Sequence, residues 1–295
     1  MQAGKIHSIE SMGLVDGPGI RTVLFLQGCR LRCRYCHNPD TWQLSGEKEM
    51  DVDQIMKMLK RYRPYYGKTG GVTCSGGEPL LQAEFVTELF KACKAENIST
   101  CLDTAGYGNG SYDALLDYTD LVIFDIKHMV PENYHELTGG EITVATAFLE
   151  AVKANGVPLW IRHVVVPGLT DGESHIRQLG EMIKTIPNVQ KVELLPYHTM
   201  GVEKYHTLGI PYSLENVPSL EQKKLQYLQN YFDEELDLQY TQSEILDQMM
   251  ELYIARVMMN SNILSELFKE TMDATLQQLL ISNAEMLNTL QEIID

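Results

Sequence analysis

Two features that would place a protein in a membrane or on nucleic acid are missing from this sequence. No apolar run approaches the ~20 residues that a membrane-spanning helix needs. The formal net charge is −16, with 24 Lys and Arg against 40 Asp and Glu, whereas nucleic-acid binding depends on a basic surface. Residues 1–5 also lead into mixed polar sequence without the apolar core of a signal peptide. We therefore expect a cytoplasmic protein with neither a membrane nor a nucleic-acid partner.

Cysteine is scarce, with six in 295 residues. In the cytoplasm thiols stay reduced, so clustered cysteines indicate metal or redox chemistry rather than disulfides. Three of the six fall within residues 28–37, in an arginine-rich stretch that ends with His37. The other three lie inside strand or helix patterns and are expected to be buried as small hydrophobic residues: Cys74, Cys93 and Cys101.

Short apolar segments alternate along the chain with longer helical patterns. The strand candidates are 21–26, 71–74, 99–103, 121–126, 159–164 and 191–195. The helix candidates are 51–62, 80–96, 111–118, 144–154, 174–186 and 220–232. This alternation predicts an α/β fold with a parallel sheet, and six units are too few for a closed eight-fold barrel. We expect a partial, open (βα)6 barrel, with the chemistry at the carboxyl ends of its strands.

The last part of the chain has a different composition. After Phe232 it contains no Gly, Pro, Cys or His, and residues 233–295 carry thirteen acidic against two basic residues. Six of the fourteen Met residues lie there, and apolar positions recur at helical spacing. The sequence thus predicts a catalytic domain over 1–240 and an acidic, Met-rich helical extension over 241–295.

The spacing Cys29-x3-Cys33-x2-Cys36 predicts a metal centre. Three thiolates this close can hold three corners of a cubane [4Fe–4S] cluster and leave the fourth iron open, whereas closed electron-transfer clusters usually take four cysteines at other spacings. With His37 adjacent, a Cys3His zinc site is the alternative. A zinc site would leave the glycines and carboxylates at the strand ends unexplained.

Glycine and polar or charged residues end three successive strand candidates. They are Gly76, Gly77 and Glu78 at the second, Asp103 and Thr104 at the third, and Asp125 and Lys127 at the fourth. Glycine lets backbone approach a ligand closely, although an ordinary turn is the alternative. Two carboxylates facing one cavity repel each other unless a cation or a ligand satisfies them, and a structural Asp125–Lys127 salt bridge is the alternative here.

These motifs resemble those of radical S-adenosylmethionine enzymes, whose hallmark is Cys-x3-Cys-x-aromatic-Cys. Within that class the sequence is similar to the activases of glycyl-radical enzymes, in the segments 11–21, 35–42, 75–79, 101–106, 160–162 and 193–198. The resemblance covers about residues 4–240. Several relatives carry further ferredoxin-like cysteine clusters, and their absence favours the activases of the pyruvate formate-lyase type over dehydratase or decarboxylase activases.

The resemblance implies a set of site residues. Cys29, Cys33 and Cys36 would ligate one [4Fe–4S] cluster. S-adenosylmethionine would contact Tyr35, Gly76, Gly77, Glu78, Asp125, Lys127 and His198. A monovalent cation would lie between Asp103, Thr104 and Asp125. The groove for the glycine-bearing loop of the partner would include Asp16, Arg162 and His198.

The implied reaction is reductive cleavage of S-adenosylmethionine at the cluster. The 5′-deoxyadenosyl radical then takes hydrogen from a glycine of a glycyl-radical enzyme, expected to be pyruvate formate-lyase. Since the cofactors carry this chemistry, no catalytic acid or base side chain is expected. An activase of another glycyl-radical enzyme, or a radical enzyme acting on a small molecule, remains an alternative. Arg30, Arg32 and Arg34 are expected either to dock an acidic electron donor such as flavodoxin or to form a solvated loop.

Overall fold

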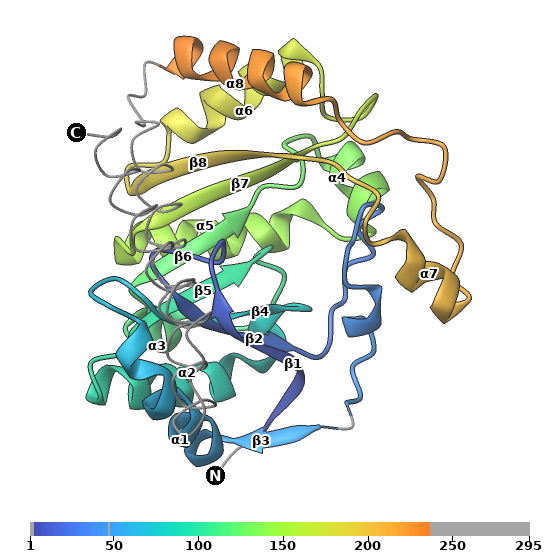
Figure 1. Ribbon diagram of the computed structural model, residues 1–295. Coiled ribbons are helices and arrows are strands. Elements are labelled where there is room, and N and C mark those ends of the chain that lie inside the picture. Colours follow the sequence, from blue (N-terminus) through green and yellow to red (C-terminus); the bar gives the residue numbers. More distant parts are fainter. Residues whose placement is uncertain (1–2, 47, 237–295) are drawn as a thin grey trace, which may run out of the picture. The chain divides into compact units, whose positions relative to one another are not determined.

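The computed structural model describes residues 3–46 and 48–236 (Figure 1). The predicted boundary at residue 240 and the helical extension over 241–295 lie outside the described residues. No helix in the described part is long and apolar enough to cross a membrane.

An eight-stranded sheet forms the centre of the described structure, in the order β3-β1-β2-β4-β5-β6-β7-β8. Six strands run parallel: β2 (Arg21–Leu26), β4 (Gly71–Gly76), β5 (Ser99–Thr104), β6 (Leu121–Asp125), β7 (Leu159–Val165) and β8 (Val189–Pro196). They coincide with the six predicted strands to within a few residues. Because β3 and β8 are the two edges among the described strands, the sheet does not close, which confirms the predicted open (βα)6 barrel.

Two strands that the sequence did not predict extend the sheet at one edge. β1 (Ala3–Gly13) pairs antiparallel with β2, and β3 (Glu49–Asp51) pairs antiparallel with β1. β1 mixes polar and apolar residues, and its pairing with β2 is interrupted by two register shifts. Its alternation is therefore too irregular to be recognised as a strand.

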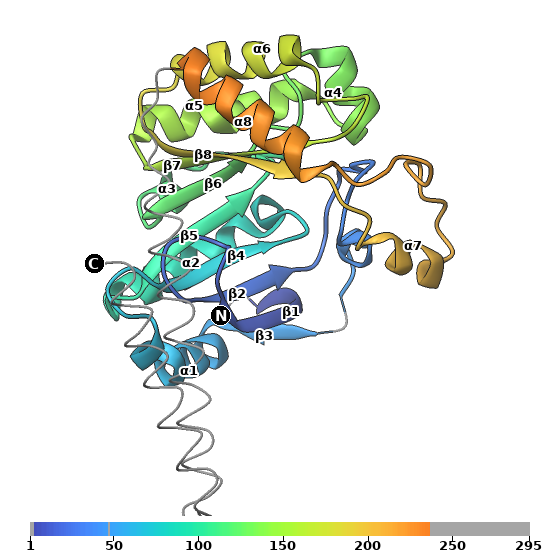
Figure 2. The ribbon, with the colours of Figure 1, turned by 45° about the horizontal axis from the view of Figure 1, so that its top comes forward.

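Six helices confirm the predicted ones: α1 (Val52–Tyr62), α2 (Ala83–Ala95), α3 (Asp113–Leu116), α5 (Ile142–Asn155), α6 (Glu173–Lys184) and α8 (Gln222–Leu236). Figure 2 shows α5, α6 and α8 gathered over β7 and β8. Three short 3-10 turns are η1 (Pro39–Thr41), η2 (Arg63–Tyr65) and η3 (Pro79–Gln82). The unpredicted helices α4 (Pro131–Thr138) and α7 (Val202–Leu208) have only eight and seven residues.

Each parallel strand presents different residues on its two faces. The helix-covered face is apolar and joins strand residues such as Val72, Leu102 and Ile161 to the helices in one core. Cys74 and Cys93 belong to that core, while Cys101 packs in a small apolar cluster with Leu121, Ile123 and Trp160. All three cysteines outside the motif are thus buried, as predicted. The alternate positions form an inner face that is rich in polar and charged residues.

Arg21 anchors the inner face at the beginning of β2. Its side chain is fully buried, and Nε donates to Thr73 Oγ1 at 2.7 Å. Its terminal nitrogens donate to the carbonyl oxygens of Pro18, Thr69, Val72 and Ser99 at 2.8–3.2 Å. Arg21 therefore fixes the loop before β2 to the strands β4 and β5.

Replacing Arg21 with Met should lower the free energy of unfolding by about 3 kcal/mol or more, because several buried carbonyl groups would lose their donor. Urea denaturation followed by circular dichroism measures the change, with the exposed Arg61→Met on α1 as the control. Equal stability of the two variants would contradict this role of Arg21.

Candidate active site

A cavity of about 250 Å³ lies at the carboxyl ends of the parallel strands. Most of the predicted site residues line it: Cys29, Cys33, Tyr35, Cys36, Gly76, Gly77, Asp103, Thr104, Asp125, Lys127 and Arg162. Three predicted residues, Asp16, Glu78 and His198, are not among its lining residues. The structure therefore brings the cysteine stretch together with the ends of β4, β5 and β6.

The loop that carries the three cysteines is held by the carboxyl end of α4. The backbone N–H groups of Arg32 and Arg34 donate to the carbonyl oxygens of Thr138 and Leu137 at 2.7 and 2.9 Å. A Cβ on Gly140 would lie 2.5 Å from Leu31 Cδ2 and 2.8 Å from Tyr107 Cε2, so these side chains would have to shift for any larger residue there. An unpredicted helix thus positions the central metal-ligand candidates.

Burial controls the charge of the three thiols. It raises the pKa of Cys29 to about 12, and the nearby Glu78 adds to this effect. It also raises the pKa of Cys33 to about 12, against the opposing influence of Lys127, and it raises the pKa of Cys36. The thiolate forms therefore need a compensating positive charge, which bound iron provides.

Gly76 and Gly77 allow two backbone segments to approach each other. Gly76 has φ = +104°, and a Cβ there would lie 2.4 Å from the backbone nitrogen of Leu26. A Cβ on Gly77 would lie 2.2 Å from the carbonyl oxygen of Gly28. The glycines are thus required by the contact of β4 with the beginning of the cysteine loop, in addition to any contact with a ligand.

Glu78 is buried and directed at the protein rather than at the cavity. Its carboxylate accepts hydrogen bonds from Thr104 Oγ1 at 2.5 Å and from the backbone N–H groups of Leu80, Ala105 and Tyr107 at 3.1–3.3 Å. Burial raises the pKa of Glu78, and these hydrogen bonds oppose the rise. Glu78 therefore holds the loop that follows β5 against the end of β4.

Asp125 and Lys127 form an ion pair at the end of β6, with Nζ 2.8 Å from Oδ2. Burial alone would lower the pKa of Lys127, but Asp125, Tyr35 and Cys33 together raise it well above its usual value. The ammonium group also lies 5.4 Å from the centre of the Tyr35 ring. The salt bridge that was the structural alternative is thus present, and it lies on the cavity wall.

Arg162 on β7 joins several carboxylates of the inner face. Its Nε lies 2.8 Å from Glu193 Oε2, and its Nη2 donates to the carbonyl oxygen of Val15, next to Asp16. Burial raises the pKa of Asp16, while the Arg162 charge opposes the rise. Asp103 accepts from Ser75 Oγ at 2.7 Å, and burial together with Asp125 raises its pKa to about 6 despite Arg162.

His198 lies apart from Asp16 and Arg162. Its ring stacks on His37, with centroids 4.1 Å apart, and its carbonyl oxygen is 3.1 Å from His37 Nε2. The structure thus brings together two of the three residues predicted for the partner groove. The third lies beside the cysteine loop, against His37, which lines the cavity.

The side chains present fit a [4Fe–4S] cluster and S-adenosylmethionine. The cavity combines three thiols with the Lys127 ammonium group and the carboxylates of Asp103 and Asp125. Tyr35 lines the cavity, and its buried hydroxyl has no hydrogen-bond partner in the described structure. Buried polar atoms are normally paired, so a ligand in the cavity would supply the partner that this hydroxyl lacks.

The geometry argues against the zinc alternative. A Cys3His zinc site needs four ligands around one ion, whereas each cysteine of a cubane binds a different iron. His37 is also turned to His198.

The fold and a family comparison define the class of protein. Residues 23–179 match the Radical SAM superfamily, and the open sheet with three thiols beside the end of its first parallel strand is the architecture of a radical S-adenosylmethionine enzyme. The chain is also similar to a solved structure, Streptococcus suis SuiB bound to the precursor peptide SuiA. The TM-score is 0.56 at 17% identity, over 77% of this chain and 47% of that one, and this likeness shows the fold alone.

Curated relatives narrow the class to one family. The chain is 52% identical to the pyruvate formate-lyase-activating enzyme of Clostridium pasteurianum, over 80% of this chain and 100% of the relative. It is 48% identical to the enzyme of the same name from Staphylococcus epidermidis, over 74% of this chain and 90% of the relative. The chain belongs to the family of pyruvate formate-lyase-activating enzymes.

Sequence reasoning missed several residues around the site. Ser75 and Glu193, the partners of Asp103 and Arg162, lie on strands at inward positions. Both occur within the segments that carried the family resemblance, so the alternation along β4 and β8 could have identified them. No sequence pattern identifies a cluster of three histidines that contact one another near the end of β6: His128, His163 and His175.

His163 is a buried neutral histidine directly behind the Asp125–Lys127 pair. Its Nδ1 lies 2.6 Å from the carbonyl oxygen of Ile126, so Nδ1 donates and Nε2 accepts from His175 Nε2 at 3.0 Å. Burial lowers the pKa of His163 to about 4. The neutral form of His163 is sufficient for the hydrogen bond to the Ile126 carbonyl oxygen. This bond supports the backbone between Asp125 and Lys127.

The lowered pKa predicts acid sensitivity. Below pH ~6.5 the unfolded chain takes up a proton at this histidine that the folded chain does not bind until about pH 4. The free energy of unfolding should therefore fall over this window as the pH drops, by up to ~3 kcal/mol from this group. His163→Gln should show a flatter profile in urea denaturation between pH 7 and 4. The exposed His135→Gln serves as the control, and identical slopes in both variants would contradict the assignment.

Proposed function

We propose that this protein activates pyruvate formate-lyase by generating a glycyl radical on it. The observation that carries the proposal is a single cavity in which three thiols face the Asp125–Lys127 pair at the carboxyl ends of the strands. The 52% identity to a relative of that name, across the whole length of the relative, supports the choice of target.

Cys29, Cys33 and Cys36 would hold the [4Fe–4S] cluster, and the adjacent cavity would hold S-adenosylmethionine. When bound and reduced, the cluster supplies the electron that cleaves S-adenosylmethionine and so generates the radical that removes hydrogen from a partner glycine. The protein binds and orients these groups, and it excludes water from them.

Each polar group on the cavity wall has a proposed task. Lys127 donates to the methionyl carboxylate of S-adenosylmethionine, and Asp125 accepts from the ribose hydroxyls. Gly76 and Gly77 present backbone groups to the methionyl amine, while Tyr35 and His198 complete the contacts with their unpaired atoms. Glu78 contributes by holding the loop of Thr104 and Ala105.

The carboxylates deeper in the cavity have a second proposed role. Asp103, Thr104 and Asp125 line the same wall and would frame a monovalent cation. Arg162 and Lys127 supply the positive charge that opposes these carboxylates in the protein alone. Asp16 and Arg162 lie together where the loop of the partner would enter, and His198 borders that path from the cysteine loop.

An anaerobic assay tests this function. With a reconstituted cluster, dithionite and S-adenosylmethionine, the protein should produce a glycyl-radical EPR doublet on purified pyruvate formate-lyase. Cys33→Ala should lose both the iron–sulfur absorption and the doublet, because a ligand is missing, whereas Cys93→Ala in the core should keep both. A doublet that forms only on a different glycyl-radical enzyme would replace the target, and stoichiometric zinc without iron would overturn the reaction.

The cysteine loop also presents charge to an electron donor. Arg30 and Arg32 are exposed, and Arg34 pairs with Glu136 at 3.3 Å. Arg32 Nη1 donates to the carbonyl oxygens of Cys29 and Leu31 at 2.9 and 2.7 Å, so this residue also supports the loop. We propose that Arg30 receives an acidic donor such as flavodoxin.

Charge reversal at Arg30 tests the docking. Arg30→Glu should slow cluster reduction by flavodoxin roughly tenfold at low salt, because encounter rates depend on complementary charge, and leave reduction by dithionite unchanged. Arg61→Glu on α1 controls for net charge. Equal slowing with both reductants would show that the substitution perturbs the cluster itself.

A further inference from the structure

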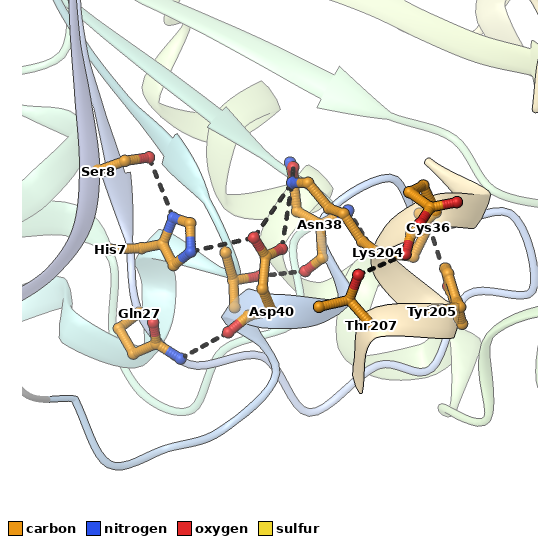
Figure 3. Close-up of polar contacts among 11 residues, drawn as sticks. His7, Ser8, Gln27, Cys36, Asn38, Asp40, Lys204, Tyr205 and Thr207 are labelled. Atoms are coloured by element: carbon orange, nitrogen blue, oxygen red, sulfur yellow. Dashed lines mark hydrogen bonds and ion pairs between the residues drawn. The ribbon is translucent and has the colours of Figure 1, made fainter. Parts of the chain in front are cut away.

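A polar network joins three separate parts of the chain beside the cysteine loop (Figure 3). Asp40, in the turn η1 that follows the loop, lies 3.2 Å from His7 Nε2 on β1 and 3.1 Å from Lys204 Nζ on α7. Gln27 Nε2 donates to the Asp40 carbonyl oxygen at 3.2 Å. Asp40 is therefore the point where the first strand, the cysteine segment and the last short helix meet.

The network reaches Cys36 by two routes. Lys204 Nζ donates to Asn38 Oδ1 at 3.0 Å, and the Asn38 backbone N–H donates to Cys36 Sγ at 3.4 Å. On the same helix, the hydroxyl group of Tyr205 donates a hydrogen bond to the Cys36 carbonyl oxygen at 3.0 Å. Both the sulfur and the backbone of this one cysteine are thus in contact with groups that α7 helps to hold.

The ion pair between Asp40 and Lys204 contributes little to the stability of the fold. The side chains of Lys204 and Asp40 are 42% and 26% exposed, and ion pairs in such positions contribute only ~0–1 kcal/mol. The pair nevertheless lies beside Cys36, because Lys204 Nζ contacts both Asp40 and Asn38, and the Asn38 backbone N–H donates to the Cys36 sulfur.

A charge that disfavours a thiolate also disfavours an added electron on iron bound to that sulfur. Cluster potentials depend on net charge, on hydrogen bonds to sulfur and on solvent exposure. Asp40 supplies a negative charge near Cys36, and Lys204 neutralises it while holding Asn38. Two further ionisable groups near this corner are His7, beside Asp40, and Lys127, beside Cys33 and Cys36 in the cavity.

We propose that the Asp40–Lys204 pair tunes the reduction potential of the cluster held by Cys36. The inference rests on the proposed function, since it requires a cluster on the three cysteines. Lys204 raises the potential by compensating Asp40, and so eases the one-electron reduction that precedes cleavage of S-adenosylmethionine. Neither residue touches the reacting atoms, so both act as positioning residues.

Redox titration of the reconstituted protein, followed by EPR of the reduced cluster, tests the proposal. At the wild-type midpoint, Lys204→Met should lower the ratio of reduced to oxidised cluster several-fold, and Asp40→Asn should raise it. A tenfold change in this ratio corresponds to 59 mV for one electron. The double variant should return close to the wild type, Lys204→Arg should preserve the potential, and added salt should shrink all the differences.

Lys153→Met is the matched control. It removes a lysine from an ion pair with Glu150 on α5, at the end that leads into the beginning of β7, away from the cysteine loop. Its potential should equal that of the wild type.

Three outcomes separate the explanations. Shifts in the same direction for Lys204→Met and Asp40→Asn would mean that loop distortion, not charge, sets the potential. Unchanged potentials in variants with native circular dichroism and full iron content would overturn the proposal while leaving the proposed function intact. A wild-type protein that takes up no cluster would instead overturn the proposed function.

Discussion

The charge of Arg162 is the constraint on which the inner face of the sheet depends. Strand register places this residue opposite Asp125 on β6 and opposite Glu193 on β8. Burial would lower its pKa, but Asp103 and Glu193 raise it, so the guanidinium stays charged. Without it, Asp103 would lose the main positive charge that opposes its raised pKa, while Asp125 would keep Lys127 and Asp16 would keep Arg21. Arg162 thus allows Asp103 and Asp125 to share a cavity with three thiols.

The second requirement is contact between the segments that follow the first and the last parallel strands, β2 and β8. β2 and β8 are not hydrogen-bonded to each other, yet the segments that follow them meet. His198 stacks on His37, and Tyr205 donates to the Cys36 carbonyl oxygen. The carboxyl end of α4 supports the same loop from another side. Side chains and helix ends therefore connect the segments after β2 and β8, which no strand pairing joins, and these contacts hold the cysteine loop.

The sequence predicts the six parallel strands well because each is a short run rich in apolar or β-branched residues that is separated from the next by a longer helical pattern. It does not predict α4 and α7, because two turns of helix contain too few apolar positions for a period to show. These are the helices that hold the cysteine loop. The cysteine motif therefore predicts which thiols line the cavity. The helices that hold the cysteine loop, α4 and α7, have no recognisable sequence pattern.

A residue that belongs to a sequence motif does not always point into the cavity. Glu78 follows Gly77 directly, but the chain has left β4 there, and four protein donors take up its carboxylate. Ser75 and Glu193 were not predicted, although both occupy inward positions on their strands. The alternation that directs Asp103, Asp125 and Arg162 inward applies equally to them. Strand parity, counted from one cavity residue, therefore identifies Ser75 and Glu193 on the inner face, whereas the hydrogen bonds of Glu78 assign it to the support of the site.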